Sequence, residues 1–212
     1  MGKAKKREKK KGAPDFISTI GRGRASFLVM TSQRTKSILA VVAVSLAANP
    51  LFVQDKPRVS PADTVTASIN GAEISIAYSR PYTKDPKSGE MRKIWGTLVP
   101  YGKVWRMGAN EATVLKTSKA LEIGGKELPA GSYSLYMWPE ESGAKLIINK
   151  ETGQWGTKYD ESKDFARVDL KKEAMDKEVD QFTIAIDKSG NDGGDLKMMW
   201  EKTQYSIAFK VK

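Results

Sequence analysis

Residues 64–78 read T-V-T-A-S-I-N-G-A-E-I-S-I-A-Y, and this stretch decides the class of fold. Apolar and polar residues alternate on both sides of Asn70 and Gly71. An Asn-Gly pair between two alternating segments is the strongest short-range signal of a β-hairpin, because both residues accept the positive φ of a type I′ turn. Ile74, Ile76 and Tyr78 fall on one face of the second strand. We therefore expect an antiparallel hairpin here.

Similar segments follow as far as the C terminus. Gly124 and Gly125 form a second two-residue turn. Residues 132–138 carry large side chains on both faces, as a central strand does. We expect a short helical turn at residues 171–177. Four further strands are expected around it and after it, at residues 165–170, 178–187, 196–201 and 204–211.

The whole pattern gives nine or ten short strands, frequent turns and no convincing amphipathic helix. It predicts an all-β, mainly antiparallel fold. Because so many alternating strands need an opposing apolar layer, we expect a two-sheet β-sandwich, jelly-roll-like or Ig-like, with one or two very short helical turns. A barrel-like closure is the alternative. We expect residues 55–212 to form this single domain.

The positive charge of the chain is concentrated near its beginning. The net charge is +11, but residues 1–54 hold 11 of the 36 Lys and Arg and only 2 of the 25 Asp and Glu. The remaining residues are therefore close to neutral. Nucleic-acid binding needs positive charge clustered on the folded domain. We expect no nucleic-acid partner.

The chain contains neither Cys nor His. This composition excludes disulfides, thiolate and imidazole metal sites, and catalytic triads that use a His base. Residues 187–192 resemble the start of a calcium loop, but Asp192 and Met198 stand where that loop needs Gly and Glu. We expect a hairpin turn there, and neither a metal nor another cofactor in the protein.

Two segments precede the predicted domain. Residues 1–29 form a Lys-rich extension, which we expect to be disordered; it is an RNA-binding or localisation arm, or it precedes a true start at Met30. Residues 30–54 begin with a positively charged region, continue with an apolar run and end near a cleavage site of small residues. This order is typical of a secretory signal peptide.

The apolar run of the predicted signal peptide extends only from Ile38 to Ala48. It is too short to span a bilayer about 30 Å thick, so an uncleaved anchor is the alternative that we do not favour. The cleavage site has no Cys, so the protein is not a lipoprotein. We expect cleavage between Ala47 and Gln54, a periplasmic or secreted location, and no stable membrane span afterwards.

Residues 94–113 read I-W-G-T-L-V-P-Y-G-K-V-W-R-M-G-A-N-E-A-T and follow neither a strand nor a helix period. A long loop of this kind normally either packs against the core and closes it or binds a ligand. We predict a ligand site formed by Trp105, Arg106, Asn110, Glu111 and Trp155. The alternative is a structural latch, in which Arg106 pairs with Glu111 while Asn110 caps a turn.

Aromatic and acidic residues leave two further interpretations open. Aromatic side chains could stack on sugar rings or could simply fill the core. Two facing carboxylates would suit glycoside hydrolysis, and the candidate pairs are Glu111 with Glu151 and Glu122 with Glu127. We expect the second pair to be a solvated hairpin edge. The sequence leaves catalysis open and favours a protein that is not an enzyme.

Four stretches in order resemble the bacterial domain-of-unknown-function family numbered 2911: I-A-Y-S-R-P, K-I-W-G-T-L-V-P-Y-G-K-V-W-R-M-G-A-N-E-A-T, L-P-A-G-S-Y-S-L and N-K-E-T-G-Q-W-G. The resemblance runs from about Ser60 to Lys212. It implies an exported bacterial protein, in agreement with a start at Met30. The family has no established activity, so the resemblance implies none.

Together these features predict an exported β-sandwich that binds a small polar, peptide or glycan ligand without catalysis. One alternative is a carboxylate-based hydrolase that acts on sugars. Another is a structural or assembly protein of the cell envelope, which a flat apolar surface patch would favour. The sequence leaves the oligomeric state open.

Overall fold

The computed structural model describes residues 58–212, so the predicted extension at 1–29 and the predicted signal peptide at 30–54 lie outside the described residues. From Arg58 to Lys212 the chain forms strands and one short 3-10 helix. In chain order these elements are β1 (Ala62–Ile69), β2 (Ala72–Ser79), β3 (Thr113–Thr117), β4 (Leu121–Ile123), β5 (Lys126–Leu128), β6 (Gly131–Pro139), β7 (Ala144–Asn149), η1 (Glu161–Lys163), β8 (Asp164–Ser189) and β9 (Gly193–Val211).

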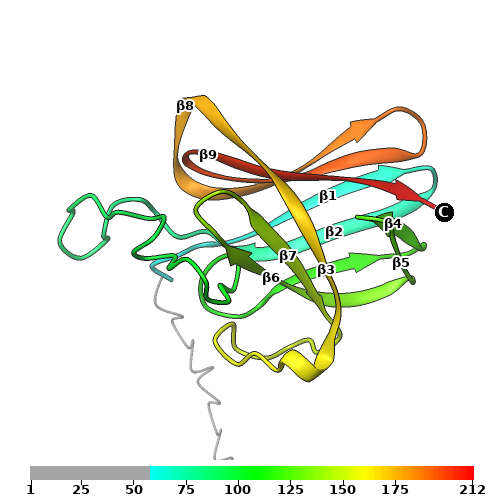
Figure 1. Ribbon diagram of the computed structural model, residues 1–212, viewed down its shortest axis with the longest axis horizontal. Helices are drawn as coiled ribbons and strands as arrows, with labels where there is room; N and C mark the ends of the chain where they lie inside the picture. Colours follow the sequence, from blue (N-terminus) through cyan, green and yellow to red (C-terminus); the bar gives the residue numbers. More distant parts are fainter. Residues whose placement is uncertain (1–57) are drawn as a thin grey trace, which may run out of the picture. The chain divides into compact units, whose positions relative to one another are not determined.

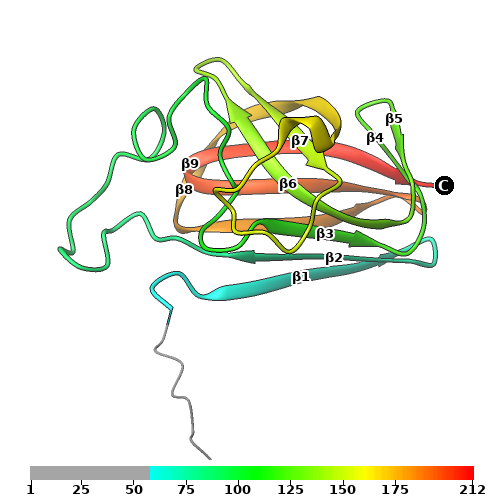
Figure 2. The same ribbon diagram turned by 90° about the horizontal axis from the view of Figure 1, so that it is seen from below.

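The strands of this part form one nine-stranded antiparallel sheet in the order β1-β2-β3-β6-β7-β8-β9-β4-β5. In Figure 1 the β8–β9 hairpin lies over β1 and β2, and β1 contacts both β8 and β9. Figure 2 shows β6 and β7 crossing in front of β8 and β9. The all-β, antiparallel prediction is confirmed. Because strand pairing continues from β1 to β5 without closing, the division into two sheets stays a prediction.

The predicted first hairpin is confirmed as β1 and β2. Asn70 and Gly71 turn the chain with φ values of 48° and 70°, and Ile69 pairs with Ala72 directly beside them. On β2 the side chains of Ile74, Ile76 and Tyr78 are buried, as the alternation predicts. Residues 132–138 lie in β6, which pairs with β3 on one side and β7 on the other.

The prediction of a helical turn at residues 171–177 is wrong. These residues belong to β8, which joins the separately predicted strands 165–170 and 178–187 into one element. Likewise, β9 joins the predicted strands 196–201 and 204–211. The only short helix from residue 58 onward is η1, which lies in the preceding loop. Residues 171–174 hydrogen-bond along β9 instead of turning into a helix.

Irregular pairing in the middle of the β8–β9 hairpin explains the error. The register shifts between Ala174 and Val179 and again between Val179 and Thr183, and opposite them Glu201 has a φ of +52°. Such bulges bend a strand pair and leave residues unpaired. Residues 176–178 are exposed, so the bend interrupts the apolar alternation without ending the strand.

Beyond the end of β2 the chain runs beside the middle of β8. The Tyr78 hydroxyl accepts a hydrogen bond from Ile184 N at 3.0 Å, and the backbone N–H of Phe182 donates to Pro81 O at 2.9 Å. Arg80 Nε donates to Phe182 O at 3.1 Å. These bonds satisfy backbone groups in the middle of β8, where its pairing with β9 is irregular. They also fix the start of the loop after β2, which forms one wall of the pocket described next.

Candidate functional site

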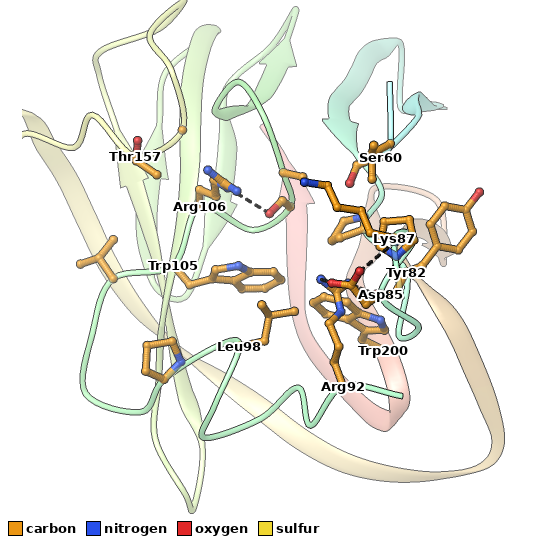
Figure 3. A pocket seen from close by; sticks show the side chains of 18 of the residues that line it. Ser60, Tyr82, Asp85, Lys87, Arg92, Leu98, Trp105, Arg106, Thr157 and Trp200 are labelled. Carbon is orange, nitrogen blue, oxygen red and sulfur yellow. Dashed lines mark hydrogen bonds and ion pairs between the residues drawn. The ribbon is translucent and has the colours of Figure 1, made fainter. Parts of the chain in front are cut away.

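A pocket lies among the loops next to the contact between the end of β2 and the middle of β8. Its volume of about 600 Å³ is within the range usual for ligand sites. Its walls come from residues 59–60, from the loop after β2, from the 98–109 part of the central loop, and from residues 156–159; Trp200 of β9 adds to them. Figure 3 shows Trp105 and Arg106 on one side of this pocket and Asp85, Lys87 and Arg92 on the other.

Trp105 is held in place by both its backbone and its ring. Its backbone exchanges two hydrogen bonds of 2.8 Å with Met137 of β6. Its ring stacks on Trp200, with centroids 5.9 Å apart and planes 21° apart, and meets Phe182 edge-on at 5.0 Å. Trp105 therefore forms a rigid wall that joins the pocket to the core.

Arg106 is the next residue after Trp105, and its side chain packs against Gly156. A Cβ atom on Gly156 would lie 2.6 Å from Cδ of Arg106 and 2.9 Å from the carbonyl oxygen of Asn110. Arg106 Nε donates to Gly108 O at 3.3 Å. Neither terminal nitrogen of Arg106 donates a hydrogen bond to any residue from 58 to 212.

Burial lowers the pKa of the Arg106 guanidinium. The group nevertheless stays protonated at physiological pH, because arginine titrates far above that range. No acidic side chain within residues 58–212 forms an ion pair with it. A desolvated cation with free donors is a strong anchor for an anionic group.

The loop after β2 adds further charge. Arg92 is occupied: it hydrogen-bonds the carbonyl oxygens of Tyr82 and Thr83, and its Nη1 lies 3.9 Å from Asp85 Oδ2. Asp85 accepts hydrogen bonds from the backbone N–H groups of Lys87 and Ser88. These bonds hold the pKa of its carboxyl below the usual value. The Lys87 ammonium forms no hydrogen bond or ion pair in the part of the chain that the structure describes.

The five residues predicted as a ligand site do not all meet. Trp105 and Arg106 line the pocket. Asn110 does not; its amide donates to Ser60 O at 3.2 Å and Ser79 Oγ at 3.3 Å. Trp155 is 47% exposed and lies outside the lining, although its neighbour Gly156 is part of it.

Glu111 lies outside the pocket and forms no latch with Arg106. Its Oε2 accepts a hydrogen bond from Arg58 Nη1 at 2.6 Å, and both side chains are about half exposed. That bond holds the pKa of the Glu111 carboxyl below its usual value. Exposed pairs of this kind add at most about 1 kcal/mol to stability.

The carboxylate pairs considered for hydrolysis do not face this pocket. Glu122 and Glu127 are cross-strand neighbours on the β4–β5 hairpin, and Glu122 pairs with Lys212. Asp85 is the single carboxylate among the lining residues. In the described residues no group of three or more acidic side chains could hold a metal ion.

The profile of the DUF2911 family, described as a protein of unknown function, matches residues 60–209. The chain belongs to the DUF2911 family. This membership confirms the resemblance found in the sequence. No curated protein and no solved structure matches the chain. Within residues 58–212 of this DUF2911 chain, no helix is long and apolar enough to cross a membrane.

Sequence reasoning missed several pocket residues of this DUF2911 domain. Tyr82, Lys87 and Arg92 lie in a polar segment, residues 81–93, in which the sequence indicates no site. Its length and two prolines between β2 and the central loop were the available signal, since long ordered loops often carry function. Trp200 gave no signal beyond its size, because it belongs to β9 and reaches the pocket from a distant part of the sequence.

Proposed function

We propose that this protein binds a small molecule in the Trp105–Arg106 pocket and does so without catalysis. One observation carries the proposal: the half-buried Arg106 guanidinium faces a pocket with both terminal nitrogens unused by residues 58–212. Burying part of a charge without a partner lowers stability, so such a residue is more easily explained by a ligand than by folding. The rigid Trp105 ring beside it supplies the contact area that a ligand needs.

The same geometry argues against the hydrolase alternative. Glycoside hydrolysis needs two carboxyl groups about 5 to 9 Å apart across a cleft. The lining offers Asp85, whose oxygens already cap a turn and face Arg92. Binding therefore accounts for the residues in the pocket better than hydrolysis does.

A blocking substitution tests the proposal. Thr157 is exposed and lies at the pocket wall, so Thr157→Trp places a bulky ring in the pocket without disturbing the core. The probes are naphthoate, naphthyl phosphate and the uncharged naphthamide. We expect at least one probe to bind the wild-type protein in calorimetric titration, and Thr157→Trp to weaken that binding by about tenfold or more.

Thr152→Trp is the matched control, because Thr152 is an exposed residue of the same loop that does not line the pocket. The control should bind the probes as the wild type does. The proposal is wrong if none of the three probes binds the wild-type protein. It is also wrong if the Thr157→Trp variant binds as well as the Thr152→Trp variant.

We also propose that the protein is exported after cleavage of residues 30–54 as a signal peptide, which places the pocket in the periplasm or outside the cell. Intact-mass analysis of protein recovered outside the cytoplasm should give a chain that begins between Ala47 and Gln54. A mass that still includes residues 1–29 would overturn this proposal.

A further inference from the structure

We infer that the ligand of this pocket is an amphipathic organic anion: one acidic group held between Arg106 and Lys87, on an aromatic or aliphatic body that packs against Trp105. The inference rests on the proposed function and names the ligand class of the same pocket. It rests on two observations: the pocket lining has an excess of positive charge, and most of its other side chains are apolar.

The pocket carries more positive than negative charge. Its charged lining residues are Lys87, Arg92, Arg106 and Asp85. Asp85 lies 3.9 Å from Arg92 and its charge also interacts with that of Lys87, so three cations share one carboxylate and the lining keeps an excess of positive charge. In Figure 3 the Lys87 side chain extends from its loop toward the part of the pocket that holds Arg106.

These two cations suit one acidic group. The fixed guanidinium of Arg106 offers two neighbouring N–H donors, a geometry that matches a carboxylate or a phosphate. The flexible Lys87 ammonium acts as a second point charge that can adjust to the bound group. Carboxylates and phosphates share this chemistry, and the experiment below separates them.

Apolar side chains dominate the rest of the lining. Pro81, Leu98, Val104 and Trp105 belong to the walls, and Trp200 stacks behind Trp105. Leu98 is 41% exposed and Val59, also part of the lining, is 57% exposed. Large exposed apolar side chains around a pocket mark a contact site for an apolar partner.

The few hydroxyl groups in the lining argue against a sugar. Ser60, Tyr82, Thr157 and Tyr159 are the hydroxyl side chains there. The Tyr159 hydroxyl is already occupied, since it donates to Asp164 at 2.6 Å and accepts from Arg167 at 2.8 Å. A sugar brings a hydroxyl on nearly every carbon, and each one buried without a partner costs binding free energy. An apolar body makes no such demand.

The test compares four probes in calorimetric titrations of the full protein: naphthoate, naphthamide, naphthyl phosphate and glucuronate. The first three share one ring system and differ in the charge and type of the head group. We expect naphthoate or naphthyl phosphate to bind about tenfold or more tightly than naphthamide, because hydrogen bonds to charged groups are the stronger ones. Whichever of the two binds more tightly identifies the acidic group.

Three variants assign the effect to its residues. Arg106→Gln should weaken the binding of the charged probe more than the binding of naphthamide, and so remove most of the advantage of the charged probe. Lys87→Gln, at an exposed position, should reduce the same advantage in part and provides the test if Arg106→Gln does not fold. Lys84→Gln is the matched control, because Lys84 is an exposed lysine of the same loop outside the lining.

Two results would overturn the inference and leave the proposed function intact. In the first, naphthoate, naphthyl phosphate and naphthamide bind equally well and Thr157→Trp still blocks all three, so that charge plays no part. In the second, glucuronate binds more tightly than either charged naphthyl probe, so that the body is polar. Failure of Thr157→Trp to block any probe would instead overturn the proposed function.

Discussion

The Trp200→Ala variant is expected to melt roughly 6–20 °C below the wild-type protein. Trp200 is 1% exposed, and its removal leaves a cavity in the core of the sheet. Replacing a buried aromatic residue with Ala costs about 3–5 kcal/mol, and each kcal/mol lowers the melting temperature of a domain of this size by about 2–4 °C. Thermal melting followed by circular dichroism measures the difference.

The surroundings of Trp200 explain why the loss is large. Its Nε1 donates to Thr83 Oγ1 at 3.1 Å, which ties β9 to the loop after β2. Its ring centroid lies 5.8 Å from that of Phe182, and the ring stacks on Trp105. The same substitution therefore removes the support behind the pocket wall, and we expect the variant to lose affinity for the naphthyl probes as well.

Trp155→Ala is the matched control. Trp155 is 47% exposed, so its removal should lower the free energy of unfolding by less than about 1 kcal/mol. Trp200→Phe separates packing from hydrogen bonding: it keeps a ring and should cost less than Trp200→Ala. Equal melting temperatures for Trp200→Ala and Trp155→Ala would show that the aromatic cluster does not hold the fold together.

The fold was predictable where the information is local. The Asn70–Gly71 turn sets the register of β1 and β2 by itself, and large residues on both faces mark β6 as a central strand. The path of β8 and β9 was not predictable in the same way. Bulges near Val179 and the positive φ of Glu201 depend on pairing between distant residues, and no alternation pattern reports them.

The pocket shows the same division. Trp105 and Arg106 are neighbours in the chain, and they lie in a loop whose Trp and Gly content indicates a packed or binding loop. Lys87 and Trp200 reach the pocket from segments far away in the sequence, so their proximity follows from the tertiary fold. Glu111 is instructive in the opposite sense. It is close to Arg106 in the chain but pairs with Arg58, which a spacing argument could not show.

The Gly108→Ala variant is expected to be destabilised by about 2–4 kcal/mol and to lose the pocket. Gly108 has a φ of +148°, and a Cβ atom there would lie 2.7 Å from the backbone carbonyl oxygen of Ser79. An alanine must therefore adopt an unfavourable φ and also push the loop away from β2. The same loop supplies the carbonyl oxygen that Arg106 Nε contacts at 3.3 Å.

Gly153→Ala separates the two causes of destabilisation, the unfavourable φ and the close contact with a backbone oxygen. Gly153 has a φ of +85° and no heavy atom within 4 Å of the added Cβ atom, so this substitution carries the backbone strain alone, about 1–2 kcal/mol. Thermal melting should therefore rank Gly108→Ala below Gly153→Ala, and Gly153→Ala should keep the probe affinities of the wild type. If both variants melt together and both still bind, the contact of Gly108 with Ser79 does not position Arg106. If Gly108→Ala alone loses binding, the close approach of this loop to β2 sets the position of the guanidinium.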